Sequence, residues 1–224
     1  MNKSFSNSTQ RFGHLLCFLN HIEGGFFMAH EHSFASPAPA GLGALAVACF
    51  GFAAVFLGWV KVEGLPILTA WLIGGGVVQY TTAVIELKDY NITGGNVFLF
   101  FSAFFMFGAS LSVLSKFFMI KFGMTPHSYV EGWTWMAGAG FLTAVTPAYA
   151  KGNKLIFILV VLLDIVLWCI VGLDLGKMDP AVGKPIVGWG LVVSGWIGIY
   201  LAGAITCNTV YGKVIFPIPT PFVK

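Results

Sequence analysis

Six apolar stretches, each close to the length of a membrane-crossing helix, constrain the fold of this chain more than any other feature. A helix needs about 20 apolar residues to cross the hydrocarbon core of a bilayer. Short breaks with Lys, Asp, Glu, Pro and Gly separate the stretches, and no proline falls in the middle of one, so each can satisfy its own backbone hydrogen bonds. The sequence therefore predicts an all-α integral membrane protein with six transmembrane helices in one compact bundle. The stretches are Pro39–Val60, Ile67–Leu87, Val97–Ile120, Trp133–Ala148, Leu155–Leu173 and Ile186–Cys207.

The composition excludes a soluble domain. Of the 224 residues 57% are apolar and 9% are charged, whereas soluble domains carry about 25% charged residues. The chain lacks the polar side chains needed to cover its surface in water, so we expect a multi-pass protein of the cell membrane (inner or plasma membrane). The net charge of +3 is too small and too dispersed to indicate a nucleic-acid partner.

The first 33 residues differ from the rest. Their apolar patch, Leu15–Leu19, is too short to span a bilayer. We expect an N-terminal extension, poorly ordered or bound to the membrane surface, ahead of a six-helix transporter domain at residues 34–224. An alternative is that Met28 is the true start of the protein.

Two prolines stand where the first apolar stretch begins. Pro37 and Pro39 have no backbone N–H group, and the first N–H groups of a helix lack intrahelical partners in any case. The free amides nearby leave a locally positive helix end, which suits an anion. The alternative interpretation is an ordinary start of a membrane helix.

The same segment, SPAPAGLG, resembles the signature NPAPLGL of the acetate uptake transporters, also called succinate–acetate permeases. Ser36 and Ala40 depart from that signature. The stretch GGGVVQYTTAVIELKDYNITGG and the C-terminal stretch from GWGLVVSG to the Pro-Ile tail are also similar to this family. The resemblance covers about residues 34–219. It implies substrate contacts at Pro37, Pro39 and Gly41.

The resemblance also implies a fold, an assembly and a gate. Six-helix subunits would form a hexamer, and each subunit would hold one path for acetate and, in some members, succinate. The path would narrow at Leu45, Phe101 and Leu163, and Gly198 would tune substrate size. The family has Phe and Tyr at the first two positions, so the gate stays apolar here but lacks the tyrosine hydroxyl.

Polar groups inside the spans are the other candidates for the path. Gln79 and Asn208 could each donate two amide hydrogens to a carboxylate; hydrogen bonding between helices is the alternative. Arginine is absent after Arg11, although a tight dicarboxylate site would favour a guanidinium group. Weak binding and fast passage of a small monocarboxylate fit better.

Two acids are candidates for proton coupling. Asp164 lies near the middle of the fifth stretch, where a charge costs about 2.5–3.5 kcal/mol on insertion scales. Our hypothesis is that Asp164 is protonated for part of the transport cycle; a paired acid at a helix or subunit interface is the alternative. Glu86 ends the second stretch beside Lys88 and Asp89, so a solvated or paired acid competes with a coupling role.

These features together predict membrane transport of acetate and similar monocarboxylates, either proton-linked or channel-like. The expected partners are a small carboxylate, protons, the lipid bilayer and further copies of the chain. Ammonium or ammonia export is one alternative, and a structural or sensory membrane protein is another. We expect no enzyme, cofactor or metal, because no histidine lies in the six stretches and no nucleophile, base or metal-ligand set converges.

Overall fold

A computed structural model describes residues 34–223 of the chain. The chain divides into two units, Met1–Ala35 and Ser36–Lys224, and the second unit contains all the described helices. The N-terminal extension predicted for residues 1–33, including Met28, lies outside the described residues.

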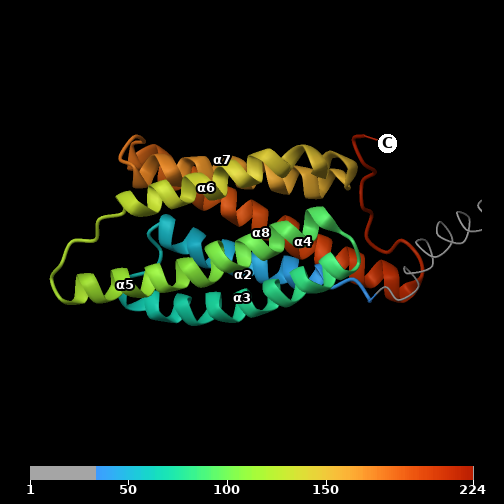
Figure 1. Ribbon diagram of the computed structural model, residues 1–224, viewed down its shortest axis with the longest axis horizontal. Helices are drawn as coiled ribbons and strands as arrows, with labels where there is room; N and C mark the ends of the chain where they lie inside the picture. Colours follow the sequence, from blue (N-terminus) through green and yellow to red (C-terminus); the bar gives the residue numbers. More distant parts are fainter. Residues whose placement is uncertain (1–33, 224) are drawn as a thin grey trace, which may run out of the picture. The chain divides into compact units, whose positions relative to one another are not determined.

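The second unit is a bundle of helices, which confirms the predicted all-α class. Within residues 34–223 the β-structure amounts to an isolated bridge between Asn153 and Pro221. Figure 1 shows the main helices running along a common direction. The elements are α2 (Ala38–Phe56), η2 (Val62–Gly64), α3 (Leu65–Lys88), α4 (Ile92–Phe101), η3 (Ser102–Gly108), α5 (Ala109–Lys121), α6 (Tyr129–Val145), η4 (Thr146–Lys151), α7 (Lys154–Asp174) and α8 (Pro180–Tyr211).

Helix α4, the segment η3 and helix α5 form one continuous rod (Figure 1). η3 is a turn of π-helix, in which hydrogen bonds run between residues five apart, and such turns occur frequently at functional sites. The buried rings of Phe101 and Phe105 lie at its start and inside it.

Side-chain caps start three of the helices where the sequence breaks. Asn91 accepts a hydrogen bond from the backbone N–H of Gly94 at 3.0 Å and so caps α4. Asn153 and Asp179 cap α7 and α8 in the same way. Such caps satisfy backbone donors that a helix start leaves without partners.

Helix α8 begins earlier than the sequence predicted. Because Asp179 caps it, the helix starts at Pro180 rather than at Ile186, and Pro185 lies inside it. The assignment of Pro185 to a break was wrong. Pro185 lies beyond the first turn of α8, so its missing N–H leaves the carbonyl of Ala181 without the usual helix donor.

Five helices in the described part of the chain are long and apolar enough to cross a membrane: α2, η2 with α3, the α4–η3–α5 rod, α7 and α8. Helix α6 has 17 residues, at the lower limit of about 17–25 residues for a span. The sixth crossing therefore stays a prediction.

Helices α2 and α8 make the most extensive contact in the bundle, and glycines allow it. A Cβ atom on Gly188 would lie 2.4 Å from Cγ of Leu57, and one on Gly195 would lie 2.7 Å from the ring of Phe50. Both distances are shorter than nonbonded carbon atoms tolerate. The absence of side chains at these positions sets how closely the two helices approach.

Large apolar side chains also cover the outside of the bundle. Trp71 is 64% exposed, Trp196 is 62% exposed and Trp189 is 55% exposed. Apolar surface on this scale is unusual for a protein surrounded by water, and aromatic side chains of this kind favour the edges of a bilayer.

Candidate functional site

An apolar cavity lies inside the bundle, between α2, α3, α4, α6, α7 and α8. We call it the inner cavity. Its volume is about 60 Å³, counted as the space that the centre of a water-sized sphere can occupy. Its lining consists of Leu42, Leu45, Gln79, Val97, Phe98, Phe101, Phe105, Leu142, Tyr149, Ile156, Leu159, Val160, Leu163, Val166, Leu167 and Leu191.

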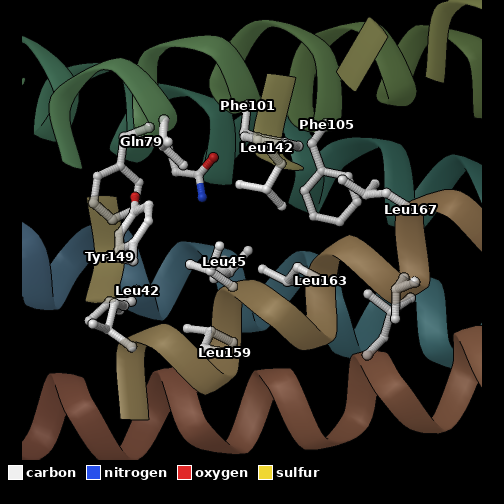
Figure 2. Close-up of a pocket in the computed structure, with 16 residues that line it drawn as sticks. Leu42, Leu45, Gln79, Phe101, Phe105, Leu142, Tyr149, Leu159, Leu163 and Leu167 are labelled. Atoms are coloured by element: carbon white, nitrogen blue, oxygen red, sulfur yellow. The ribbon is translucent and has the colours of Figure 1, made fainter. Parts of the chain in front are cut away.

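The three residues expected to form the gate meet in this cavity. Leu45 comes from α2, Phe101 from the end of α4 and Leu163 from α7, and all three line the cavity. Figure 2 shows their side chains reaching toward the same space. Phe105 joins them from η3, and its ring centroid lies 6.2 Å from that of Phe101. Phe101 and Phe105 are four residues apart, so both rings lie on the same face of the rod, and both line the inner cavity.

Gln79 supplies an amide to the inner cavity. Its side chain is 1% exposed, and Figure 2 shows the amide pointing into the space between the helices. Among residues 34–223 its oxygen Oε1 has no hydrogen-bond partner. Buried polar atoms are nearly always paired, so an unpaired amide oxygen at a cavity indicates a place for a ligand or water.

Tyr149 is a lining residue that sequence reasoning missed. It lies in η4, between the predicted fourth and fifth stretches, and its side chain reaches the inner cavity (Figure 2). Burial raises the pKa of its hydroxyl, and the negative charge of Glu86 raises it further. The hydroxyl is therefore a neutral hydrogen-bond donor at physiological pH. A tyrosine in a polar break gives no periodic signal that would have identified it.

A second pocket, which we call the outer pocket, adjoins the inner cavity. Its volume, counted in the same way, is about 370 Å³. Leu42, Phe98, Tyr149 and Ile156 line both spaces and so form the wall that they share. The other residues of the outer pocket are Ala38, Glu86, Asn91, Thr93, Gly94, Ala148, Lys151, Gly152, Asn153, Leu201 and Ile205.

Glu86 is the acid of the outer pocket. It is 5% exposed, and its carboxylate accepts hydrogen bonds from Nδ2 of Asn91 and, at 3.5 Å, from Oγ of Ser36. Of the interpretations of Glu86 as a solvated or a paired acid, the paired one agrees with the structure, because the carboxylate is buried and hydrogen-bonded. Its coupling role stays a prediction.

The proline signature lies at the edge of the outer pocket. Pro39 stands in the first turn of α2, and the carbonyl of Pro37 accepts from the N–H groups of Ala40 and Gly41. A Cβ atom on Gly41 would lie 2.8 Å from the methyl group of Thr82. Pro37, Pro39 and Gly41 are absent from the lining of both pockets, whereas Ala38 of the same signature lines the outer one.

The structure does not bring Asn208 to either space. Its side-chain oxygen accepts from the N–H groups of Ile215 at 2.7 Å and Phe216 at 3.0 Å, and its amide donates to the carbonyl of Phe216 at 2.8 Å. These three bonds hold the C-terminal tail. The amide is already engaged in this structure, and the expected substrate contact of Asn208 stays a prediction.

Gly198 also lies outside the lining of the inner cavity. A Cβ atom on it would lie 3.3 Å from the carbonyl oxygen of Leu42. The residue therefore lies where α8 closely approaches the backbone of α2. Its expected role in tuning substrate size stays a prediction.

Asp164 faces helix α6, and the inner cavity lies elsewhere around α7. Its two carboxylate oxygens accept from Thr143 at 3.1 Å and from Thr146 at 2.6 Å. The indole N–H of Trp168 donates to the same Thr143 hydroxyl at 3.1 Å. This is the paired acid at a helix interface that the sequence left open as an alternative, and its coupling role stays a prediction.

No metal centre is evident within residues 34–223, where no three His, Cys, Asp or Glu side chains gather. The chemical capacity of the site lies in one amide, one neutral hydroxyl and apolar walls. Such a site can hold a small, weakly polar molecule through one or two hydrogen bonds.

The fold and the cavity define an all-helical bundle of membrane-capable helices around a small apolar cavity. Comparison with protein-family models gives no match, and comparison with curated proteins gives none either. Among solved structures the chain is similar to the bacterial acetate channel SatP, with a TM-score of 0.71 and 23% sequence identity over 83% of this chain and 99% of that chain. The resemblance to the acetate uptake transporters is thereby confirmed for the fold.

Proposed function

We propose that this protein carries acetate and similarly small monocarboxylates across the cell membrane. The observation that carries the proposal is the inner cavity, a small apolar space with a single unpaired buried amide, Gln79. It sits in a fold similar to that of a bacterial acetate channel. The apolar helices and exposed tryptophans support a location in the bilayer.

In this proposal Leu45, Phe101 and Leu163 form the constriction of the path. Aliphatic and aromatic walls admit a solute slowly unless it is small and weakly solvated, and weak contacts allow release. The outer pocket collects the solute beside Lys151 and Asn91, and Tyr149 lies between this pocket and the inner cavity. The size of that cavity favours acetate over succinate.

The test is uptake of labelled acetate by proteoliposomes that contain the full-length protein. Widening the constriction with Leu163→Ala should accelerate uptake of a larger acid, such as butyrate, relative to acetate. Ile165→Ala, on the exposed face of the same helix, is the matched control. Equal uptake in protein-free liposomes would contradict the proposal, and so would an unchanged butyrate-to-acetate ratio in Leu163→Ala.

Proton coupling through Asp164 or Glu86 is the proton-linked form of the proposal. Asp164→Asn should remove the pH dependence of acetate uptake if Asp164 couples the two movements. Glu86→Gln tests the acid of the outer pocket in the same assay. An unchanged pH curve in both variants would favour a channel-like mechanism.

Assembly into a hexamer is also proposed, on the strength of the sequence resemblance. The exposed apolar surface of the bundle provides area for contacts between copies. Mass measurement of the protein extracted in native-like lipid particles tests the number of subunits. A monomeric mass would contradict the proposal.

Ammonium transport remains a second candidate because of one observation. The rings of Phe98, Phe101 and Phe105 line the inner cavity, and Glu86 lies in the adjoining pocket. Aromatic faces and an acid can attract a cation. Uptake of labelled methylammonium, compared with uptake of labelled acetate in the same proteoliposomes, decides between the two solutes.

A further inference from the structure

The inner cavity offers hydrogen bonds from two side chains and no positive charge. Gln79 and Tyr149 are the polar members of its lining, and the other lining residues are aliphatic or aromatic. A carboxylate in an apolar space without a cation or several donors is unfavourable. The charged form of an acid is therefore a poor match for this cavity.

The amide of Gln79 matches an uncharged group better. A primary amide carries a donor, N–H, and an acceptor, C=O, side by side. A carboxylate can only accept, so it would leave the buried Oε1 of Gln79 without a partner. A protonated carboxyl group or a carboxamide both accepts and donates, and it can pair with the amide in a ring of two hydrogen bonds.

Tyr149 provides a second donor at the wall between the two pockets. Its hydroxyl remains protonated because burial and the nearby carboxylate of Glu86 both disfavour the phenolate. A neutral O–H can donate to the carbonyl oxygen of an acid or an amide. It adds no charge that would favour an anion.

The volume of the cavity limits the ligand to a very small molecule. About 10–15 Å³ by this measure holds one water. The roughly 60 Å³ of the inner cavity therefore accommodates a molecule of only a few non-hydrogen atoms. Acetic acid and acetamide are such molecules, and they have nearly the same shape.

We propose that Gln79 and Tyr149 form a binding site for uncharged carboxyl groups, which takes the protonated form of short monocarboxylic acids and, by the same pairing, short primary carboxamides such as acetamide. The inference rests on the proposed function, and it deepens it by naming the chemical form of the solute. It adds a class of solute, the small amides, that carries no charge at any physiological pH.

The experiment uses the full-length protein in proteoliposomes with labelled acetamide and labelled acetate. Protein-free liposomes give the passage through lipid, which is subtracted. We expect protein-dependent entry of acetamide and competition between the two solutes. Gln79→Leu, which removes both hydrogen bonds of the pair, should lower both protein-dependent rates at least about tenfold.

Tyr149→Phe is the second variant, and it removes only the hydroxyl. We expect the half-saturating concentration of both solutes to rise several-fold, with little change in the maximal rate. Tyr80→Phe is the matched control, because Tyr80 neighbours Gln79 in the sequence but is 52% exposed and lies outside the inner cavity. It should behave like the unaltered protein.

The outcomes separate this inference from the proposed function. Acetate entry without acetamide entry or competition would overturn the uncharged site and leave the proposed function standing. An acetate current across a planar bilayer that disappears in Gln79→Leu would overturn the inference in the same way. Protein-dependent entry of neither solute would overturn both.

Discussion

Gly188 of α8 packs against Leu57 at the end of α2. Gly188→Ala should lower the free energy of unfolding by about 1–3 kcal/mol, the usual cost of overpacking, since the added methyl group would overlap Leu57. Thermal unfolding of the purified protein in detergent measures the loss. Gly203→Ala on the same helix is the control, because its Cβ meets nothing within 4 Å and alanine stabilises helices. Leu57→Ala should rescue Gly188→Ala; failure of the rescue would contradict the close contact.

Asn208 controls the C-terminal tail through three hydrogen bonds. Asn208→Ala should cost about 1–2 kcal/mol of stability and expose the tail to trypsin at Lys213. Acetate uptake should stay close to that of the unaltered protein, because the residue lines neither pocket. Limited proteolysis followed by mass spectrometry reports the cleavage. A large loss of uptake with an intact tail would show that Asn208 contacts solute after all.

Individual site residues were predictable only where local pattern and position coincide. Gln79 stands out in the sequence as an amide inside an apolar stretch, and the structure places it in the cavity. Asn208 has the same signal, but the chain turns back eight residues later and engages it. Tyr149 reaches the cavity from a connecting segment. Contacts between segments decide such cases, and a single sequence does not contain them.

The π-helical turn η3 is the element that carries Phe105 to the inner cavity. Deleting Ala103 should convert η3 to regular α-helix and shorten the spacing between Phe101 and Phe105 from four residues to three. The resulting rotation of Phe105 relative to the cavity should lower acetate uptake at least about tenfold, while helical content stays unchanged. Circular dichroism and proteoliposome uptake are the measurements. Deleting Thr125, in the exposed connection between α5 and α6, is the control. Uptake that survives the Ala103 deletion would show that η3 has no part in the path.

Helix positions followed from the sequence, but their ends and irregularities did not. Every predicted apolar stretch overlaps a helix, because a helix that crosses a bilayer needs a long run of apolar residues, and such runs are visible in the sequence. The start of α8 depends on the cap by Asp179. In the sequence this residue is one of several polar residues in a break, so the cap could not be recognised. The extra residue in η3 leaves no mark on an apolar run, because hydrophobic side chains occur on all faces of that rod.

At the scale of the whole molecule, the C-terminal tail runs from the end of α8 to the start of α7. Figure 1 shows it leaving α8 and running across the ends of the helices. The N–H of Val223 donates to the carbonyl of Ala150 at 3.2 Å, and the ring of Phe222 lies 5.4 Å from that of Phe157. The ammonium group of Lys154 lies 5.2 Å from the same Phe222 ring. The tail thus fastens the segment that lines the outer pocket.

Phe222→Ala tests this fastening. The substitution should lower the free energy of unfolding by about 0.5–1.5 kcal/mol, which is the contribution of an aromatic pair beyond its buried area. It should also accelerate amide hydrogen exchange in residues 150–154. Hydrogen exchange with mass spectrometry detects the change. Val214→Ala in the same tail is the control, because Val214 is 74% exposed. Unchanged exchange in Phe222→Ala would mean that the tail does not hold this segment.

The same attachment has a consequence for the order of folding. The segment that follows α8 packs on Ala150 and Phe157, which precede α8 in the chain. This side of the outer pocket can therefore assume its final form only after α8 has taken its place in the bundle. Removal of the segment after Tyr211 would leave the helices in place but the outer pocket without this support.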